Sequence, residues 1–114
     1  MPRYVILRHD HPALHWDLML EAGDRLRTWR LAELPHPGVV VAAEPIGDHR
    51  RLYLDYEGPV SGGRGTVERW DAGTFAGDAN APERVTVSVD GRRLRGVLTL
   101  ARTESGGWEC RFDQ

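Results

Sequence analysis

The sequence predicts an all-β fold, a small antiparallel β-barrel of about eight short strands with little helix. Apolar residues occur in short runs or alternate with polar ones, which is the pattern of strands. Clusters rich in glycine, proline and aspartate separate these runs at regular intervals, and only 29–34 has the pattern of a helical turn. With 114 residues and no linker or repeat, the chain is expected to form a single domain over residues 1–114.

In the first half of the chain, each expected strand is bounded by a turn signal. The segment 14–31 is expected to form a hairpin around a turn at 22–24, and 45–50 is expected to be a loop. The apolar runs favour strands at 3–8, 14–21, 25–31, 39–44 and 51–57.

In the second half, the turn-rich segment 58–65 precedes a strand, and 72–83 is expected to be a loop. The clearest hairpin spans 84–102, because Asp90-Gly91 suits a type I′ turn, which needs positive φ at both central residues. Strands are therefore expected at 66–71, on both sides of that turn, and at 108–112.

Composition limits the functional classes. The formal net charge of −2 excludes a whole-chain basic footprint for nucleic acid but allows a local basic groove. The one cysteine, Cys110, permits no disulfide within the chain and is expected to be a packed thiol. No signal-peptide pattern and no apolar run of about 18 residues is present. We therefore expect an intracellular, cytoplasmic protein with no membrane partner.

The segment 9–20, "HDHPALHWDLML", concentrates histidine and aspartate beside the first expected strand. On the strand 14–21, alternation places His15, Asp17 and Met19 on one face. The opposite face is apolar and is expected to face the core; it carries Leu14, Trp16, Leu18 and Leu20. Imidazole and carboxylate two residues apart on one side of a strand can converge on a single ion.

His9 ends the preceding strand, and the connection 10–14 can return the chain so that His9 lies over His15. Two histidines and one carboxylate form a ligand set for a divalent first-row metal with open positions for water and substrate. The spacing alone leaves two other interpretations open. The polar residues can be an ordinary solvent face of an antiparallel strand, or the set can hold the iron of a non-haem oxygenase.

The stretch 7–29 resembles the opening of the 3′-phosphoesterase domain of bacterial DNA ligase D. That family has a basic residue and a histidine, a second histidine, an aromatic residue, an aspartate, a Leu-Glu and later a tryptophan. The matching residues here are Arg8-His9, His15, Trp16, Asp17, Leu20-Glu21 and Thr28-Trp29. A second block matches in order through Asp48-His49, Tyr53, Tyr56-Glu57-Gly58, Val67, Trp70-Asp71 and Gly73-Thr74. The final "DGRRLRGVLTLAR" and a closing tryptophan resemble the last hairpin of the family.

The resemblance implies a small β-barrel and a manganese-dependent enzyme. It implies that His9, His15 and Asp17 bind the metal and that His49 contacts the scissile phosphate. Tyr53 matches a family tyrosine near the site. Manganese is the metal of the family, while zinc and other divalent metals accept the same ligands.

Two cations of the family pattern are absent. The family has an arginine two positions after the metal aspartate, where this chain has Met19. The family's Pro-Lys-Gly is replaced by "AEL" at 32–34, which removes a phosphate-binding lysine. An arginine near the first hairpin is expected to substitute. Arg27 is the predicted substrate-binding residue, and Arg25, Arg30 and Arg50 are its neighbours.

Two short motifs have simpler interpretations. The segment 61–66, "SGGRGT", has the composition of a phosphate nest, but no strand-to-helix context supports one and a hairpin turn is expected. The basic "RRLR" at 92–95 is expected to be a solvated patch that protects a strand edge.

The sequence therefore predicts a metal-dependent phosphoesterase that acts on 3′-phosphate or 3′-ribonucleotide ends of nucleic acid in DNA repair. The partner is then the 3′ end of a primer–template, and a ligase or polymerase on a separate chain is a further expected partner. The alternative is a catalytically weakened relative that serves as a metal-, nucleic-acid- or partner-binding module, because Met19 and the absent lysine reduce the positive charge of the pocket. The sequence leaves open whether the substrate is DNA, RNA or a mononucleotide.

Overall fold

The structure, a computed structural model, describes residues 1–114 and is built almost entirely from antiparallel strands. One short 3₁₀ helix, η1 (Arg51–Leu54), interrupts them. The strands are β1 (Arg3–His9), β2 (His15–Ala22), β3 (Arg25–Leu31), β4 (Val40–Arg50), β5 (Gly58–Pro59), β6 (Thr66–Ala76), β7 (Arg84–Gly91), β8 (Arg95–Arg102) and β9 (Trp108–Asp113). The all-β prediction is confirmed.

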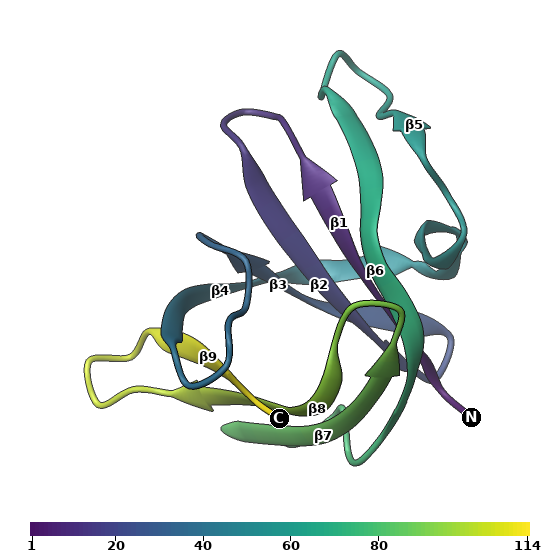
Figure 1. The fold of residues 1–114 in the computed structure, drawn as a ribbon. Helices are drawn as coiled ribbons and strands as arrows, with labels where there is room; N and C mark the ends of the chain where they lie inside the picture. The colour runs from purple at the N-terminus through teal and green to yellow at the C-terminus, as the bar shows by residue number, and fades with distance from the viewer.

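The sheet closes on itself into a ring. Its strand order is β1-β2-β3-β4-β9-β8-β7-β6-β5, and β1 also pairs with β6. Figure 1 shows β1 between β2 and β6, where this second pairing joins the two ends of the sheet. The two-residue strand β5 attaches to the outside of this ring through β6. Closure pairs most of the strand edges that an open sheet would expose.

The main core fills the interior of the ring. Strand β7 alternates strictly between exposed and buried residues, with Val85, Val87 and Val89 pointing inward. Large side chains from the other strands complete this core, including Trp29 and Phe112. The alternation explains why a period-two pattern in the sequence was sufficient to locate these strands.

A second, smaller core lies on the outer face of β1, β2 and β3. It contains Val5, Leu7, Met19, Leu26, Leu54 and Val67. Leu54 of η1 covers this face, so β1 and β2 are buried on both sides. Leu14, expected in the main core, is instead 48% exposed because it precedes β2 and lies in the connecting loop. Leu18 and Leu20 face the main core as predicted, with Trp16 packed at its edge.

Two segments after residue 44 differ from the prediction. The expected loop 45–50 continues β4 along β3, as far as the pair Arg25–Arg50. Pro45 is tolerated because β9 pairs only with residues 40–43 of β4, which leaves the later part with a free edge. The expected strand 51–57 begins instead as η1, because its apolar residues do not alternate into one layer: Leu54 is buried and Leu52 exposed.

In the second half, β6 extends to Ala76, five residues into the expected loop 72–83. The hairpin 84–102 is present, but its turn lies at residues 92–94. The predicted type I′ turn at Asp90-Gly91 is wrong, since no residue other than glycine has positive φ. The carboxylate of Asp71 moves the turn, because it accepts hydrogen bonds from the backbone N–H groups of Arg93 and Leu94.

Residues 29–34 form no helical turn, because Trp29 and Leu31 belong to β3 and pair with β2 and β4. The structure has no helix long and apolar enough to span a membrane.

Candidate metal centre and its pocket

The strand register brings three predicted ligands together on the outer face of β1 and β2. His9 is the cross-strand partner of His15, and Asp17 follows two residues later on the same face. Directly opposed residues in an antiparallel pair have Cβ atoms about 5 Å apart, close enough for both side chains to reach one ion. One ligand atom from each of the three residues lies within 4.8 Å of the others.

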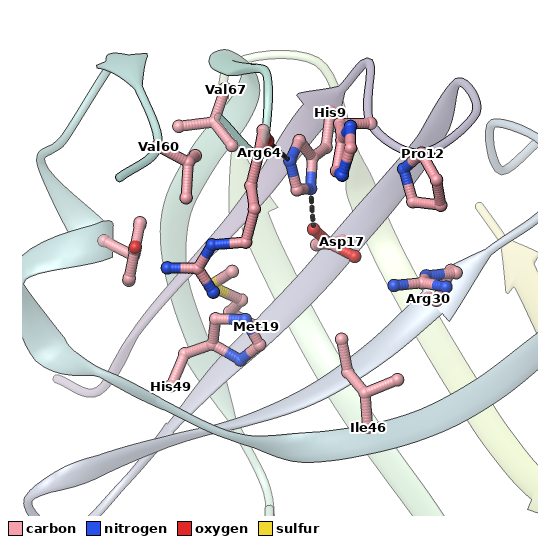
Figure 2. Close-up of a pocket in the computed structure, with 12 residues that line it drawn as sticks. His9, Pro12, Asp17, Met19, Arg30, Ile46, His49, Val60, Arg64 and Val67 are labelled. Atoms are coloured by element: carbon pink, nitrogen blue, oxygen red, sulfur yellow. Dashed lines mark hydrogen bonds and ion pairs between the residues drawn. The ribbon is translucent and has the colours of Figure 1, made fainter. Parts of the chain in front are cut away.

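The carboxylate of Asp17 lies between the two imidazoles. Its Oδ2 is 3.3 Å from His9 Nδ1, and its Oδ1 is 3.1 Å from His15 Nε2. Figure 2 shows His9 pointing toward Asp17 at one end of the pocket. His15 Nε2 and Asp17 Oδ1 are buried and, despite their short separation, are not aligned for a hydrogen bond with each other or with any other group. Both atoms therefore lack a partner.

The outer nitrogen of each imidazole is held by the backbone. His9 Nε2–H donates to the carbonyl oxygen of Arg64 at 2.8 Å, and His15 Nδ1–H donates to that of Ala13 at 2.9 Å. In neutral imidazoles this leaves His9 Nδ1 and His15 Nε2 as acceptors beside a third acceptor, the Asp17 carboxylate. Three acceptors that converge in this way fit a divalent cation, and the outer hydrogen bonds orient the rings for it.

The glycine-rich turn that supplies the Arg64 carbonyl packs against the loop after β1. Asp10 Oδ1 accepts a hydrogen bond from Thr66 N at 2.8 Å, which holds the pKa of Asp10 below its ordinary value. Gly65 has φ +74°, and a Cβ there would lie 2.3 Å from Asp10 Oδ1 and 2.6 Å from the Cβ of His11. The sequence Gly-Arg-Gly thus permits the close approach that places a carbonyl on His9.

A pocket of about 290 Å³ opens beside these ligands. His9 and Asp17 line one end of it, and Met19 contributes to its apolar wall. His49 and Tyr53, which come from the end of β4 and from η1, also line the pocket. The structure therefore brings the predicted phosphate-side residues to the same cavity as the predicted metal ligands.

His49 is positioned by its own neighbours. Its Nδ1–H donates to the carbonyl oxygen of Gly47 at 2.9 Å, and its ring meets the edge of Tyr53 with centroids 5.6 Å apart. Tyr53 in turn meets Tyr56 edge to face at 5.9 Å. These contacts leave His49 Nε2 free to bind a group in the pocket.

The predicted substrate-binding residue Arg27 is not brought to this pocket. Its guanidinium donates to the carbonyl oxygens of Ala79 and Ala81 and lies 4.6 Å from the centroid of the Trp29 ring. Arg27 is the cross-strand partner of Leu20, which faces the main core, so its side chain lies on the opposite face of the sheet from Asp17.

The positive charge in the pocket comes from Arg30 and Arg64. Arg30 is the cross-strand partner of Asp17, and its place on the hairpin made it one of the sequence candidates. The sequence does not indicate Arg64 as a pocket residue, because its segment has only the composition of a turn. The available signal was the pair of glycines around it, which allow the close approach described above. His11 is a further lining residue that the sequence did not single out.

Comparison with known proteins assigns the family. Residues 7–102 match the family model described as the DNA ligase D 3′-phosphoesterase domain. The multifunctional non-homologous end joining protein LigD of Pseudomonas aeruginosa is 31% identical over 120 residues, covering 96% of this chain. The glucans biosynthesis protein G of Rhodopseudomonas palustris is 30% identical over 116 residues, covering 92% of the chain. The chain spans 14% and 20% of the lengths of these two relatives.

The two relatives carry names from different processes, so the assignment depends on the family match, which covers most of the chain. It includes every residue of the three-ligand cluster, together with His49 and Tyr53. The resemblance seen in the sequence is confirmed: this chain belongs to the DNA ligase D 3′-phosphoesterase domain family.

Proposed function

We propose that the chain is a divalent-metal-dependent phosphoesterase that acts on 3′-phosphate or 3′-ribonucleotide ends of nucleic acid during DNA repair. The observation that carries this proposal is the cluster of His9, His15 and Asp17, whose ligand atoms lie within 4.8 Å of one another while backbone carbonyls hold the outer nitrogen of each ring. Membership of the 3′-phosphoesterase domain family supports the reaction type.

His9, His15 and Asp17 would hold the metal, with Mn²⁺ as the first candidate and Zn²⁺ as the second. When bound, such an ion supplies Lewis acidity toward a phosphoryl oxygen and lowers the pKa of a coordinated water. The Arg64 and Ala13 carbonyls fix the orientation of the two imidazoles, so little reorganisation is needed on binding.

His49 is the proposed partner of the phosphate. Because its Nδ1–H is bound to Gly47, a hydrogen bond from Nε2 to a phosphoryl oxygen requires the imidazolium form. For a 3′-phosphate end, hydrolysis forms a bond between phosphorus and the oxygen of water, which gives up one proton to the surrounding solvent, and breaks the bond to the 3′ oxygen. That oxygen leaves with a proton, for which the imidazolium of His49 is the proposed donor. Tyr53 supports the ring of His49.

The activity is tested with a primer–template that ends in a 3′-phosphate. Metal-stripped protein is assayed alone, with Mn²⁺ and with Zn²⁺, and the product is resolved on a gel. We expect conversion to the 3′-hydroxyl only with metal, and loss of conversion in His15→Ala. Full activity of His9→Ala, His15→Ala and Asp17→Ala would contradict the proposal.

A ribonucleotide-ended primer and a 3′-mononucleotide, assayed in parallel, define the substrate class. Binding of Mn²⁺ without phosphate release from any of these substrates would favour the binding-module alternative. The buried Met19, which adds no charge to the pocket, is the observation that keeps this alternative in the test. Oxygen consumption by the iron-loaded protein, with no phosphate release, would indicate the oxygenase.

The proposed partners follow from the product. A 3′-hydroxyl is the end that polymerases extend and ligases seal, so we propose that such an enzyme on a separate chain acts next. An added DNA ligase should seal nicks that carry a 3′-phosphate only after treatment with this protein and metal. Sealing without that treatment would contradict this order of action.

A further inference from the structure

The pocket contains two arginines, on different structural elements, whose roles the metal centre does not explain. Arg30 lies on β3 and Arg64 in the turn between β5 and β6. Figure 2 shows them on either side of Asp17, with the guanidinium of Arg64 extending toward Met19 and His49. We propose that Arg30 and Arg64 together form the anion-binding part of the pocket and hold the phosphate oxygens of the substrate, an inference that rests on the proposed function.

Arg64 combines two separate contacts in one residue. Its backbone carbonyl accepts the hydrogen bond from His9, and its side chain reaches into the pocket. Arg64 Nε–H donates to the carbonyl oxygen of Ser61 at 2.7 Å, and Nη2 donates to Ser61 Oγ at 3.2 Å. These bonds orient one edge of the guanidinium and leave Nη1 without a protein partner. The exposed side chain therefore has donors available for an anion.

Arg30 lies on the other side of Asp17 from Arg64 (Figure 2). Because it is the cross-strand partner of Asp17, its side chain lies on the same face of the sheet as the metal ligands. Its Nε is buried and has no hydrogen-bond partner. No carboxylate lies within ion-pair distance of its guanidinium. An unpartnered buried donor is costly, and an anion in the pocket would satisfy it.

A phosphate in this pocket needs positively charged side chains near it, because Asp17 is itself a carboxylate. A phosphate monoester placed beside Asp17 meets a buried carboxylate, and the apolar Met19 offers it no donor. Guanidinium groups present parallel N–H donors that match the oxygens of a phosphate, and they remain charged at every working pH. Arg30 and Arg64, on different sides of Asp17, can therefore bind a phosphate without contacts from His9 or His15.

The test measures anion and metal binding separately, on the full chain. Inorganic phosphate is titrated into metal-free protein and followed by NMR, and Mn²⁺ binding is followed by the EPR signal of the free ion. Arg64→Ala removes the guanidinium but keeps the backbone carbonyl on His9. We expect about tenfold weaker phosphate binding, the usual effect of losing one charge-assisted hydrogen bond, with unchanged Mn²⁺ affinity.

Two further variants and a control sharpen this test. Arg30→Gln should also weaken phosphate binding by about tenfold, while Mn²⁺ binds equally or more tightly because a positive charge near Asp17 is lost. Gly65→Ala should have the opposite signature, weaker Mn²⁺ binding, because its Cβ displaces the turn that holds His9. Arg102→Ala removes an exposed arginine outside the pocket and controls for the change in net charge.

Wild-type phosphate affinity in both Arg64→Ala and Arg30→Gln would overturn the inference, as would failure of the metal-free wild-type protein to bind phosphate. Loss of Mn²⁺ binding in Arg64→Ala would overturn the separation of its side chain from its carbonyl. The proposed function fails by a different result, the absence of phosphate release by the metal-loaded wild type.

Discussion

Asp17 and Asp71 are two buried carboxylates of the same ring, but their surroundings are opposite. Asp71 accepts hydrogen bonds from the Tyr4 hydroxyl and from the backbone N–H groups of Arg93 and Leu94. Asp17 faces two imidazole nitrogens at 3.3 and 3.1 Å, the other nitrogen of each ring is bound to a backbone carbonyl, and Asp17 Oδ1 has no hydrogen-bond partner. Asp71 is thus satisfied by hydrogen bonds of the fold, whereas Asp17 has only the two imidazoles beside it and is the carboxylate that we propose to bind a cation.

On the proposed function, this difference separates a structural carboxylate, Asp71, from a metal-binding one, Asp17. Asp71 connects β1, β6 and the 92–94 turn, and its oxygens lie so close to Gly91 that a Cβ there would be 2.5 Å from Oδ2. Removing Asp71 should therefore change stability, while removing Asp17 should change metal binding and activity.

The largest effect is expected for Asp17→Ala. Since even partners that only orient metal ligands are worth about 10- to 100-fold, loss of a ligand should lower metal-dependent phosphate release by at least about 100-fold. The stability of the metal-free protein should change little, because the lost carboxylate is poorly satisfied there. Phosphate release and urea unfolding measure the two effects. A large loss of stability with retained activity would show that Asp17 is a structural carboxylate and not a metal ligand.

Asp71→Ala should destabilise the protein by about 3 kcal/mol, because it leaves two backbone donors and a hydroxyl without an acceptor in a buried region. Urea unfolding measures this cost. The folded fraction should bind Mn²⁺ as the wild type does. Equal stability of Asp71→Ala and wild type would show that the three hydrogen bonds contribute nothing net.

Metal addition should distinguish the two aspartates directly. At a free Mn²⁺ concentration 100 times the dissociation constant, the wild type should gain about 2.7 kcal/mol of stability. Asp71→Asn should show the same gain at its lower baseline, and Asp17→Asn should show none. The readout is the shift of the unfolding midpoint when the metal is replaced by EDTA. An undiminished shift in Asp17→Asn would place the ion elsewhere.

Tyr4→Phe should cost about 1–2 kcal/mol, since it removes one donor from Asp71 without changing the size of the side chain. Burial, followed by the hydrogen bond to Asp71, raises the pKa of the Tyr4 hydroxyl. Folding therefore favours its protonated form, and that stability is present below pH 10 and lost as the pH rises above about 10. A profile of unfolding free energy against pH should fall less steeply there in Tyr4→Phe.

The sequence was informative wherever a local pattern determines the structure. Alternation located β2 and β3, and it placed His15 and Asp17 on one face. The spacing between His9 and His15 matched the register that the structure has. These predictions succeeded because a strand pair relates neighbouring residues by simple geometry.

Long-range contacts account for what the sequence did not predict. Nothing near Asp71 indicates that its carboxylate will cap a turn more than 20 residues away, so the turn was expected at Asp90-Gly91. Arg64 reaches the pocket only because its turn packs on the loop at Asp10. The wrong prediction for Arg27 has a local cause instead, because strand alternation within the hairpin directs its side chain to the face opposite Asp17.

The most direct measurement counts the Mn²⁺ ions bound by the wild type, Asp17→Asn and Asp71→Asn at equal protein concentration, from the EPR signal of the free ion. We expect one ion per chain in the wild type and in Asp71→Asn, and none in Asp17→Asn. Equal binding by all three proteins would contradict the account, because the acceptors on β1 and β2 would then not be the metal centre.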